Sequence, residues 1–234
     1  MGHKVHPTIY RLPLIYTWDS KWYARKDKMP LFLKQEIAIR DYLEKKLKGA
    51  GVDAIGIERG QKELTVNILA AKPGVIIGRS GTDLDVIRKH IEKKILAFTM
   101  KVKLNIMPLK SPALSAQVVG QGVVEEIENR MPFRRVMKKV LEKVMAAGAK
   151  GVKIKMSGRL NGAEIARSET LSAGKMSLIT LRSDVDYAIV EANTLYGKIG
   201  IKVWVYHGEA FGRKDKFEKK EEDKKVINAP APKR

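Results

Sequence analysis

The first half of the chain carries apolar residues at helical and strand spacings in turn. After Pro30 they recur at intervals of seven, four and four residues until Gly49, which predicts a helix. Residues 54–59 and 64–70 are typical of two strands joined by a turn. A short apolar helix, a longer helix over residues 82–95 and a strand at 101–106 follow. The predicted order over residues 30–108 is helix, strand, strand, helix, helix, strand.

A second pattern begins after Pro108 and Pro112, which mark a domain boundary. Apolar spacing predicts one helix over residues 116–127 and another between Pro132 and Gly148. Strands are predicted near residues 152–156, 180–190 and 199–206, with a loop at 159–167. Helices followed by strands indicate a small α+β domain over residues 109–212, with two helices packed on one face of a β-sheet.

At the two ends of the chain, apolar residues recur at neither helical nor strand spacing. Residues 1–29 form a basic and aromatic arm. Residues 213–234 combine mixed charge, few apolar residues and an Ala-Pro-Ala-Pro run. Such a segment buries too little apolar surface to offset its conformational entropy, so we expect a disordered charged tail.

Charge narrows the possible partners. The 234 residues include 46 Lys+Arg and 26 Asp+Glu, a net charge of +20, and a surface of this kind attracts nucleic acid. No apolar run is long enough for a membrane span, and residues 1–30 lack the apolar core of a signal peptide. Cysteine is absent, which agrees with a reducing compartment and excludes thiolate chemistry. We expect a cytoplasmic protein with no membrane contact, cofactor, bound metal or small-molecule substrate.

A glycine loop supplies the first candidate site. Gly78, Arg79, Ser80 and Gly81 separate the short apolar helix from the longer one. Glycine lets a ligand backbone come close, Arg79 adds positive charge, and the following helix N-terminus attracts phosphate. A KH domain clamps about four nucleotides of single-stranded nucleic acid in this way. The element order is that of a type II KH domain, which we therefore assign to residues 30–108; a plain glycine turn is the alternative.

Two further Gly-x-x-Gly sequences, at residues 148–151 and 197–200, lack this context. Gly148 follows a helix and is typical of a C-terminal cap. The second sequence leads into a strand and has no helix N-terminus beside it.

A basic stripe on the helix after Pro132 is the second candidate site. At about 100° per residue, Arg134, Arg135, Lys138 and Lys139 share one face, and apolar residues occupy the other. Glu142 is the only counter-charge within that arc, so most of these cations lack a partner one turn away. The stripe either binds a polyanion or is a solvated basic face.

Other candidate RNA contacts lie in the arm and in the 159–167 loop: Lys4, His6, Arg11, Trp22, Arg159 and Arg167. Aromatic rings can stack on bases and cations can contact phosphates, but the arm can equally pack on the protein's own domains. Asp184 and Asp186, two residues apart in a strand, could bind a cation, although ion pairs are the commoner role.

No catalytic constellation, P-loop or metal-ligand cluster is present in the sequence, so we expect no enzyme. Three hypotheses remain: a structural RNA-binding protein, a free KH-domain regulator of transcription or RNA turnover, and a KH appendage of an enzyme. The third lacks its catalytic module. The second usually relies on several RNA-binding modules.

Seven motifs in order resemble a known family. They are Met1-Gly2-x-Lys4-Val5-His6-Pro7, the 78–81 loop, Phe133-Arg134-Arg135, Ser157-Gly158-Arg159-Leu160, Gly162-Ala163-Glu164-Ile165-Ala166-Arg167, Asp184-x-Asp186-Tyr187 and Gly200-Ile201-Lys202-Val203-Trp204. Together they resemble the bacterial-type ribosomal protein S-three family of the small subunit, over about residues 1–212. The segment 168–180 and Asn161 depart from the family pattern.

The resemblance implies a place in the head of the small subunit, with contacts to small-subunit rRNA and to proteins of the S-ten and S-fourteen families. It also implies that Arg134, Arg135 and Lys138, with Lys139 beside them, line the entrance for mRNA and support its unwinding without ATP. A bacterial cytoplasm is expected, and an organelle-encoded origin is the alternative.

Overall fold

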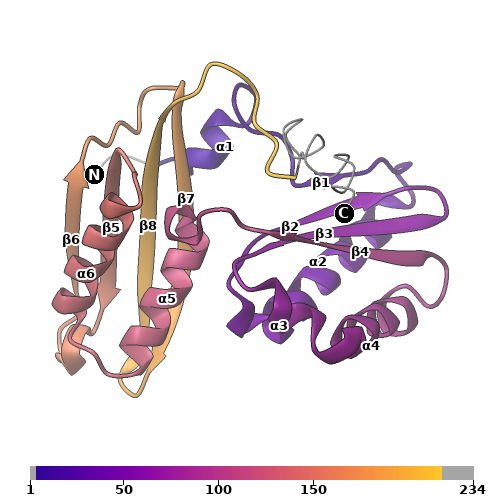
Figure 1. Ribbon diagram of the computed structural model, residues 1–234, viewed down its shortest axis with the longest axis horizontal. Helices are drawn as coiled ribbons and strands as arrows, with labels where there is room; N and C mark the ends of the chain where they lie inside the picture. The colour runs from indigo at the N-terminus through magenta and orange to yellow at the C-terminus, as the bar shows by residue number, and fades with distance from the viewer. Residues whose placement is uncertain (1–3, 218–234) are drawn as a thin grey trace, which may run out of the picture.

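The structure is a computed structural model that describes residues 4–217, without the side chain of Ser80. Two α+β units lie beside each other and are joined by the segment that follows residue 108 (Figure 1). The N-terminal arm and the last described residues run along the top of both units, so that both ends of the described part of the chain contribute to the connection between them.

The first unit has the predicted order of a type II KH domain. Its elements are α2 (Met29–Lys46), β2 (Val52–Arg59), β3 (Glu63–Ala70), α3 (Pro73–Ile77), α4 (Thr82–His90) and β4 (Lys101–Pro108). Short turns at Lys48–Ala50 and Arg79–Gly81 and a π-turn at Ile91–Ile95 connect them. Strand β2 pairs antiparallel with β3, and β3 pairs parallel with β4. The core contains the residues expected from the helical spacing, including Ile39, Leu43, Ile87 and Ile91.

The second unit places two helices on one face of an antiparallel sheet, as predicted. Its elements are α5 (Ala116–Glu128), α6 (Phe133–Ala146), β5 (Gly151–Gly158), β6 (Arg167–Gly174), β7 (Ser183–Thr194) and β8 (Gly197–Glu209), with one-turn helices at Pro112–Leu114 and Leu160–Gly162. The strand order is β6-β5-β8-β7. Val152, Ile154 and Met156 on β5 are fully buried against the helices. Gly148 has φ 94° just after α6, which confirms it as a helix cap.

Strand β6 was not predicted. Its sequence is mainly small and polar, and only Leu171 and Ala173 pack against the core, so the hydrophobic alternation is weak. Pairing along the whole of β5, from Gly151 with Gly174 to Gly158 with Arg167, creates the strand. A tertiary partner therefore overrides a weak local pattern.

The arm contains two short elements with no sequence period. Helix α1 (Pro7–Arg11) lies against β7, and β1 (Ser20–Lys21) adds to the KH sheet in parallel with β2. Each domain therefore receives part of the arm.

The predicted disordered tail requires a correction at its start. Residues 213–217 contact the folded chain: Tyr16 and Lys214 form a parallel β-bridge, and the Phe217 ring lies against Gly56 of β2. Residues 218–234 of that prediction lie outside the described part of the chain.

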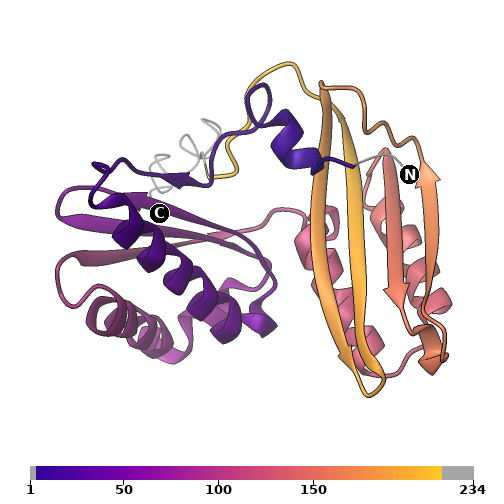
Figure 2. The same ribbon diagram turned by 180° about the vertical axis from the view of Figure 1, so that it is seen from behind.

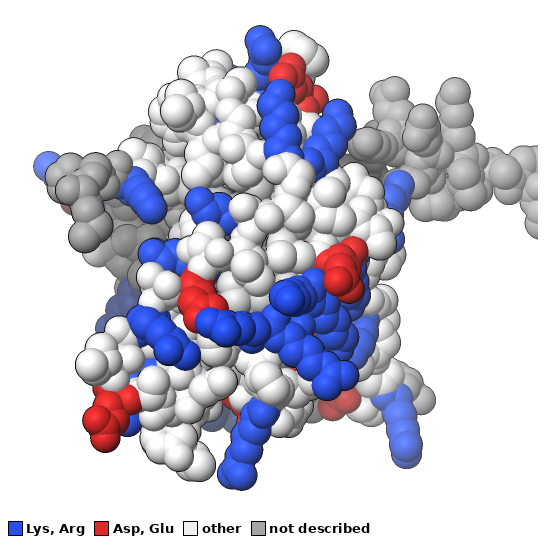
Figure 3. Space-filling view, turned by 90° about the vertical axis from the view of Figure 1, so that its left-hand side faces the viewer, with Lys and Arg blue, Asp and Glu red and all other residues white. Residues whose placement is uncertain are grey.

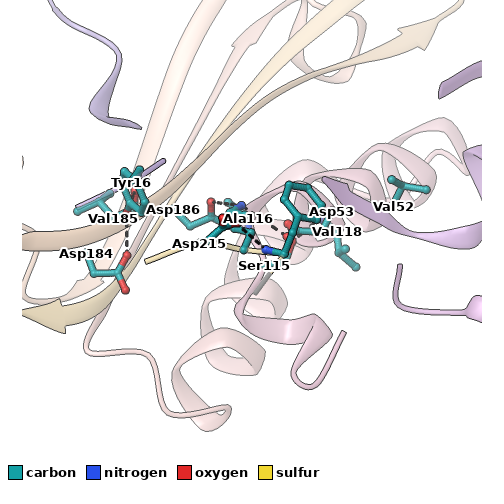
Figure 4. A network of polar contacts seen from close by, with 12 residues as sticks. Tyr16, Val52, Asp53, Ser115, Ala116, Val118, Asp184, Val185, Asp186 and Asp215 are labelled. Carbon is teal, nitrogen blue, oxygen red and sulfur yellow. Dashed lines mark hydrogen bonds and ion pairs between the residues drawn. The ribbon is translucent and has the colours of Figure 1, made fainter. Parts of the chain in front are cut away.

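A group of aspartates joins the two domains (Figure 4). The Ser115 hydroxyl donates to Asp53 of β2 and accepts from the Val118 N–H at 3.2 Å, which caps α5. The Ala116 N–H donates to Asp186 of β7 at 2.7 Å. Both carboxylates therefore lie at the N-terminus of α5, where the helix dipole favours negative charge.

Lys216 closes this junction from the C-terminal side. Its ammonium group lies 3.5 Å from Asp53 and 3.3 Å from Asp186, so it bridges the KH sheet and the second sheet. Burial opposes its charge, but the attraction of Asp186 and Asp53 outweighs burial and raises the pKa of Lys216. Asp184 forms a neighbouring ion pair with Lys214 and accepts from the Tyr16 hydroxyl at 2.7 Å. The ion-pair role expected for Asp184 and Asp186 is confirmed.

Candidate nucleic-acid interface

The glycine loop lies between α3 and α4, at the position of the nucleotide clamp in a KH domain. Gly78 has φ 71° and Gly81 has φ 78°, conformations that favour glycine at both positions. The Arg79 side chain is exposed, and the Thr82 hydroxyl donates to the Arg79 carbonyl at 2.9 Å. The loop therefore presents a cation beside the N-terminus of α4.

Asp83 modifies the charge of this loop, an effect that the spacing of the glycines does not indicate. A methyl group at Gly78 would lie 2.2 Å from Asp83 Oδ2, so the carboxylate rests directly against the loop backbone. Asp83 and Asp85 lie in the first turn of α4, where their negative charge interacts favourably with the helix dipole. They also oppose an incoming phosphate, so the loop is a weaker anion site than its glycines and Arg79 suggest.

The basic stripe of α6 is exposed as predicted. Phe133, Val136 and Val140 are buried against the sheet, which turns the opposite face of the helix to solvent. A shallow hollow on that face is lined by Arg134, Arg135, Lys138, Lys139 and Glu142. On this side of the second domain, Lys and Arg side chains gather in a continuous group with few acidic neighbours (Figure 3).

Two of the four stripe cations have carboxylate partners from other elements. Arg134 makes two hydrogen bonds with Glu169 of β6, at 3.1 and 2.9 Å, and Lys139 lies 2.6 Å from Glu126 of α5. Hydrogen bonding from Arg134 lowers the pKa of the Glu169 carboxyl. Within residues 4–217, Arg135 and Lys138 have no ion-pair partner and are exposed. Because Glu169 and Glu126 belong to other elements, the spacing of charged residues along α6 could not reveal these partners.

Arg167 extends the stripe onto β6. The Arg167 guanidinium lies 6.0 Å from the centre of the Phe133 ring and 3.9 Å from the Glu169 carboxylate. The Arg134 guanidinium lies 5.7 Å from the centre of the same ring. Arg159 lies elsewhere: it donates to the Ala163 carbonyl at 2.9 Å and stacks near Tyr196, so it stabilises its own loop. The 159–167 loop therefore supplies one exposed arginine to the stripe.

Arg11, proposed as an RNA contact, is instead a structural residue. It is fully buried, and its guanidinium donates to the carbonyls of Pro7, Leu178 and Thr180 at 3.0, 2.8 and 3.0 Å. These bonds fasten α1 to the loop before β7. A buried arginine with this geometry has no access to phosphate, so we correct the prediction.

The other arm candidates differ in exposure. Lys4 is exposed, whereas the Trp22 indole donates to Glu36 at 2.5 Å and packs edge-on against Phe32. His6 caps α1 and contacts the Tyr187 ring at 4.7 Å, and burial lowers its pKa. These contacts favour the packing alternative for Trp22 and His6 and leave Lys4 available to RNA.

No group of three or more potential metal ligands occurs among residues 4–217. In the same part of the chain, every helix is too short or too polar to span a membrane.

The fold and the glycine loop define a KH-type RNA-binding protein with a second α+β domain. A family model of the KH domain matches residues 38–114, and one of the ribosomal protein S3 C-terminal domain matches residues 123–205.

Curated relatives match nearly the whole chain. Small ribosomal subunit protein uS3 of Enterococcus faecalis is 46% identical over 219 residues, which cover 94% of this chain and 99% of that protein. The uS3 protein of Desulforudis audaxviator is 47% identical, and the match covers 89% of this chain and 94% of that protein. The uS3 protein of Paraburkholderia phymatum is 42% identical, and the match covers 92% of this chain and 80% of that protein. The chain belongs to the uS3 family.

Replacing Arg11 with Met should lower the stability of the full chain by about 2–4 kcal/mol, because three backbone carbonyls lose a buried cationic donor. Thermal melting measures the loss, and RNA affinity below the melting temperature should not change. Exposed Arg25→Met is the control. Unchanged melting together with weaker RNA binding would contradict the structural role.

The glycine loop yields a paired prediction. Arg79→Asp should weaken binding of a short single-stranded RNA, and Asp83→Asn should strengthen it, each by roughly 3- to 10-fold at low salt. Fluorescence anisotropy measures both. Arg88→Gln, which removes an exposed arginine paired with Asp85 further along α4, serves as the control. If both loop variants bind like the control, the loop does not contact RNA.

Proposed function

We propose that this protein is a structural constituent of the small ribosomal subunit, located in its head and bound to small-subunit rRNA. Membership in the uS3 family, whose relatives carry that subunit in their names, supports the assignment. The net charge of +20 supports rRNA as the partner, because many phosphates must be neutralised in such an assembly. Proteins of the S-ten and S-fourteen families are the proposed neighbours, and a bacterial cytoplasm is the proposed location.

The α6 stripe is the proposed contact with mRNA at the entrance of its channel. The observation that carries this proposal is the pair Arg135 and Lys138, which are exposed and lack an ion-pair partner among the described residues, between the paired Arg134 and Lys139. Cations of this kind contact phosphate oxygens and do not distinguish bases. A strand held this way can slide, which continuous decoding requires.

The proposed contribution to unwinding is electrostatic. Glu169 holds Arg134 in a bidentate geometry, so the guanidinium is oriented before mRNA arrives. Cations that bind the phosphates of one strand of an mRNA hairpin stabilise the separated strand relative to the duplex. The ribosome's own translocation then supplies the movement, and this chain needs no nucleotide hydrolysis.

The variant Arg134→Ala/Arg135→Ala/Lys138→Ala tests this function. Its ribosomes should assemble and should translate unstructured mRNA at nearly the normal rate. Loss of three exposed charge contacts, together about 1–2 kcal/mol, should slow passage through a stable hairpin roughly 5- to 30-fold. The difference from wild type should shrink as salt increases.

A matched variant removes the same charges elsewhere: Arg88→Ala/Arg182→Ala/Lys103→Ala, all ion-paired outside the stripe. Time-resolved translation of hairpin and hairpin-free messages compares the two variants. Equal slowing on both messages would contradict the unwinding role. Failure of the stripe variant alone to enter subunits would show that the stripe binds rRNA.

A further inference from the structure

One face of the second sheet is turned away from α5 and α6, and this face is toward the viewer in Figure 2. Its side chains are basic. Because side chains alternate along β5, the burial of Val152, Ile154 and Met156 against the helices turns Lys153 and Lys155 to the other side. Lys155 pairs directly with Lys202 of β8, and Thr170 and Ile189 complete that row across the sheet. Of the seven motifs that carry the family resemblance, the one at residues 200–204 includes Lys202, whereas Lys153 and Lys155 belong to none of them.

The face is positive, and Lys153 Nζ lies 5.6 Å from the centre of the Trp204 ring. Among the described residues, Lys153, Lys155 and Lys202 form no ion pair. Glu191 shares this face, but it is already paired with Lys198 at 2.7 Å. Glu169 pairs with Met156 in the sheet and therefore lies on the helix side, where it binds Arg134. Like charges directly opposite each other destabilise a sheet, so the Lys155–Lys202 pair costs free energy in the isolated protein. A polyanion would remove that cost.

The remaining side chains indicate which part of a nucleic acid fits. Ser168, Thr170 and Ser172 on β6 are exposed and supply hydroxyl donors beside the lysines. The aromatic residues of this face are not free to stack on bases, because Trp204 and Tyr206 are buried with Val185 in a small cluster against Met176 and Tyr187. A face with cations and hydroxyls but without stacking rings suits a duplex backbone better than single-stranded bases.

We propose that Lys153, Lys155 and Lys202, with the hydroxyls of β6, bind the sugar–phosphate backbone of double-helical ribosomal RNA. This face lies across the sheet from the α6 stripe, so the second domain would contact rRNA on one side and mRNA on the other. The proposal rests on family membership and on the sheet register, and it does not require the stripe to bind mRNA.

The variant Lys155→Gln/Lys202→Gln tests the lysines. The full chain should melt at the same or a slightly higher temperature, because two opposed charges are removed. Its binding to small-subunit rRNA should lose about one to two units of salt slope, the loss expected for two phosphate contacts. The matched variant Lys103→Gln/Lys198→Gln removes two exposed, ion-paired lysines and should keep the wild-type slope. Equal slopes for the two variants, or a lower melting temperature with an unchanged slope, would overturn the proposal.

A tethered probe identifies what covers the face. The chain has no cysteine, so Thr170→Cys provides a unique attachment point for an iron chelate that generates hydroxyl radicals. In reconstituted small subunits the probe should cleave both strands of an rRNA helix, and adding Lys155→Gln/Lys202→Gln should reduce the cleavage several-fold. No rRNA cleavage near Thr170, as expected if a neighbouring protein covers the face, would overturn the proposal.

Discussion

The position of two carboxylates at the N-terminus of α5 determines how the two domains meet. Asp53 comes from the KH sheet and Asp186 from the second sheet, and both accept hydrogen bonds from the residues that begin this helix. Two aspartates so close together repel each other. The helix dipole and the ammonium group of Lys216 offset that repulsion, so the contact depends on a residue close to the end of the described chain. The Gln121 amide adds a bond of 3.2 Å to the Val52 carbonyl at the same place.

This junction matters because the candidate RNA contacts lie on different domains. The glycine loop belongs to the KH unit, whereas the α6 stripe and the basic sheet face belong to the second unit. Phosphate contacts position a protein on RNA and carry little sequence information, so their value depends on their spacing. A fixed angle between the domains lets separate contacts act together, because the entropy of orienting one domain relative to the other is lost on folding and not on binding.

The sequence predicted the parts of this protein that depend on local pattern. The KH order followed from apolar spacing and from two glycines placed between two helical patterns, and the exposed stripe followed from one helix's periodicity. Strand β6 was missed because its pairing with β5, and not its own composition, creates it. Arg11 was misassigned because two of its three carbonyl partners, Leu178 and Thr180, lie more than 160 residues away in the sequence. A similar separation hid the bridge from Lys216 to Asp53. Contacts of this kind become visible only when the fold brings both partners together.

The interdomain distance in the full chain tests most directly whether the junction fixes the two units. Since the chain lacks cysteine, nitroxide labels can be attached at Glu44→Cys on α2 and Lys143→Cys on α6 alone. Pulsed electron–electron double resonance then measures the distance between these two labels. The wild-type junction should give one narrow distribution, and Asp53→Ala/Lys216→Met should broaden it while each domain keeps its circular dichroism. Lys103→Met, which removes an ion-paired lysine far from the junction, should leave the distribution narrow. An equally narrow distribution in the junction variant would contradict the account.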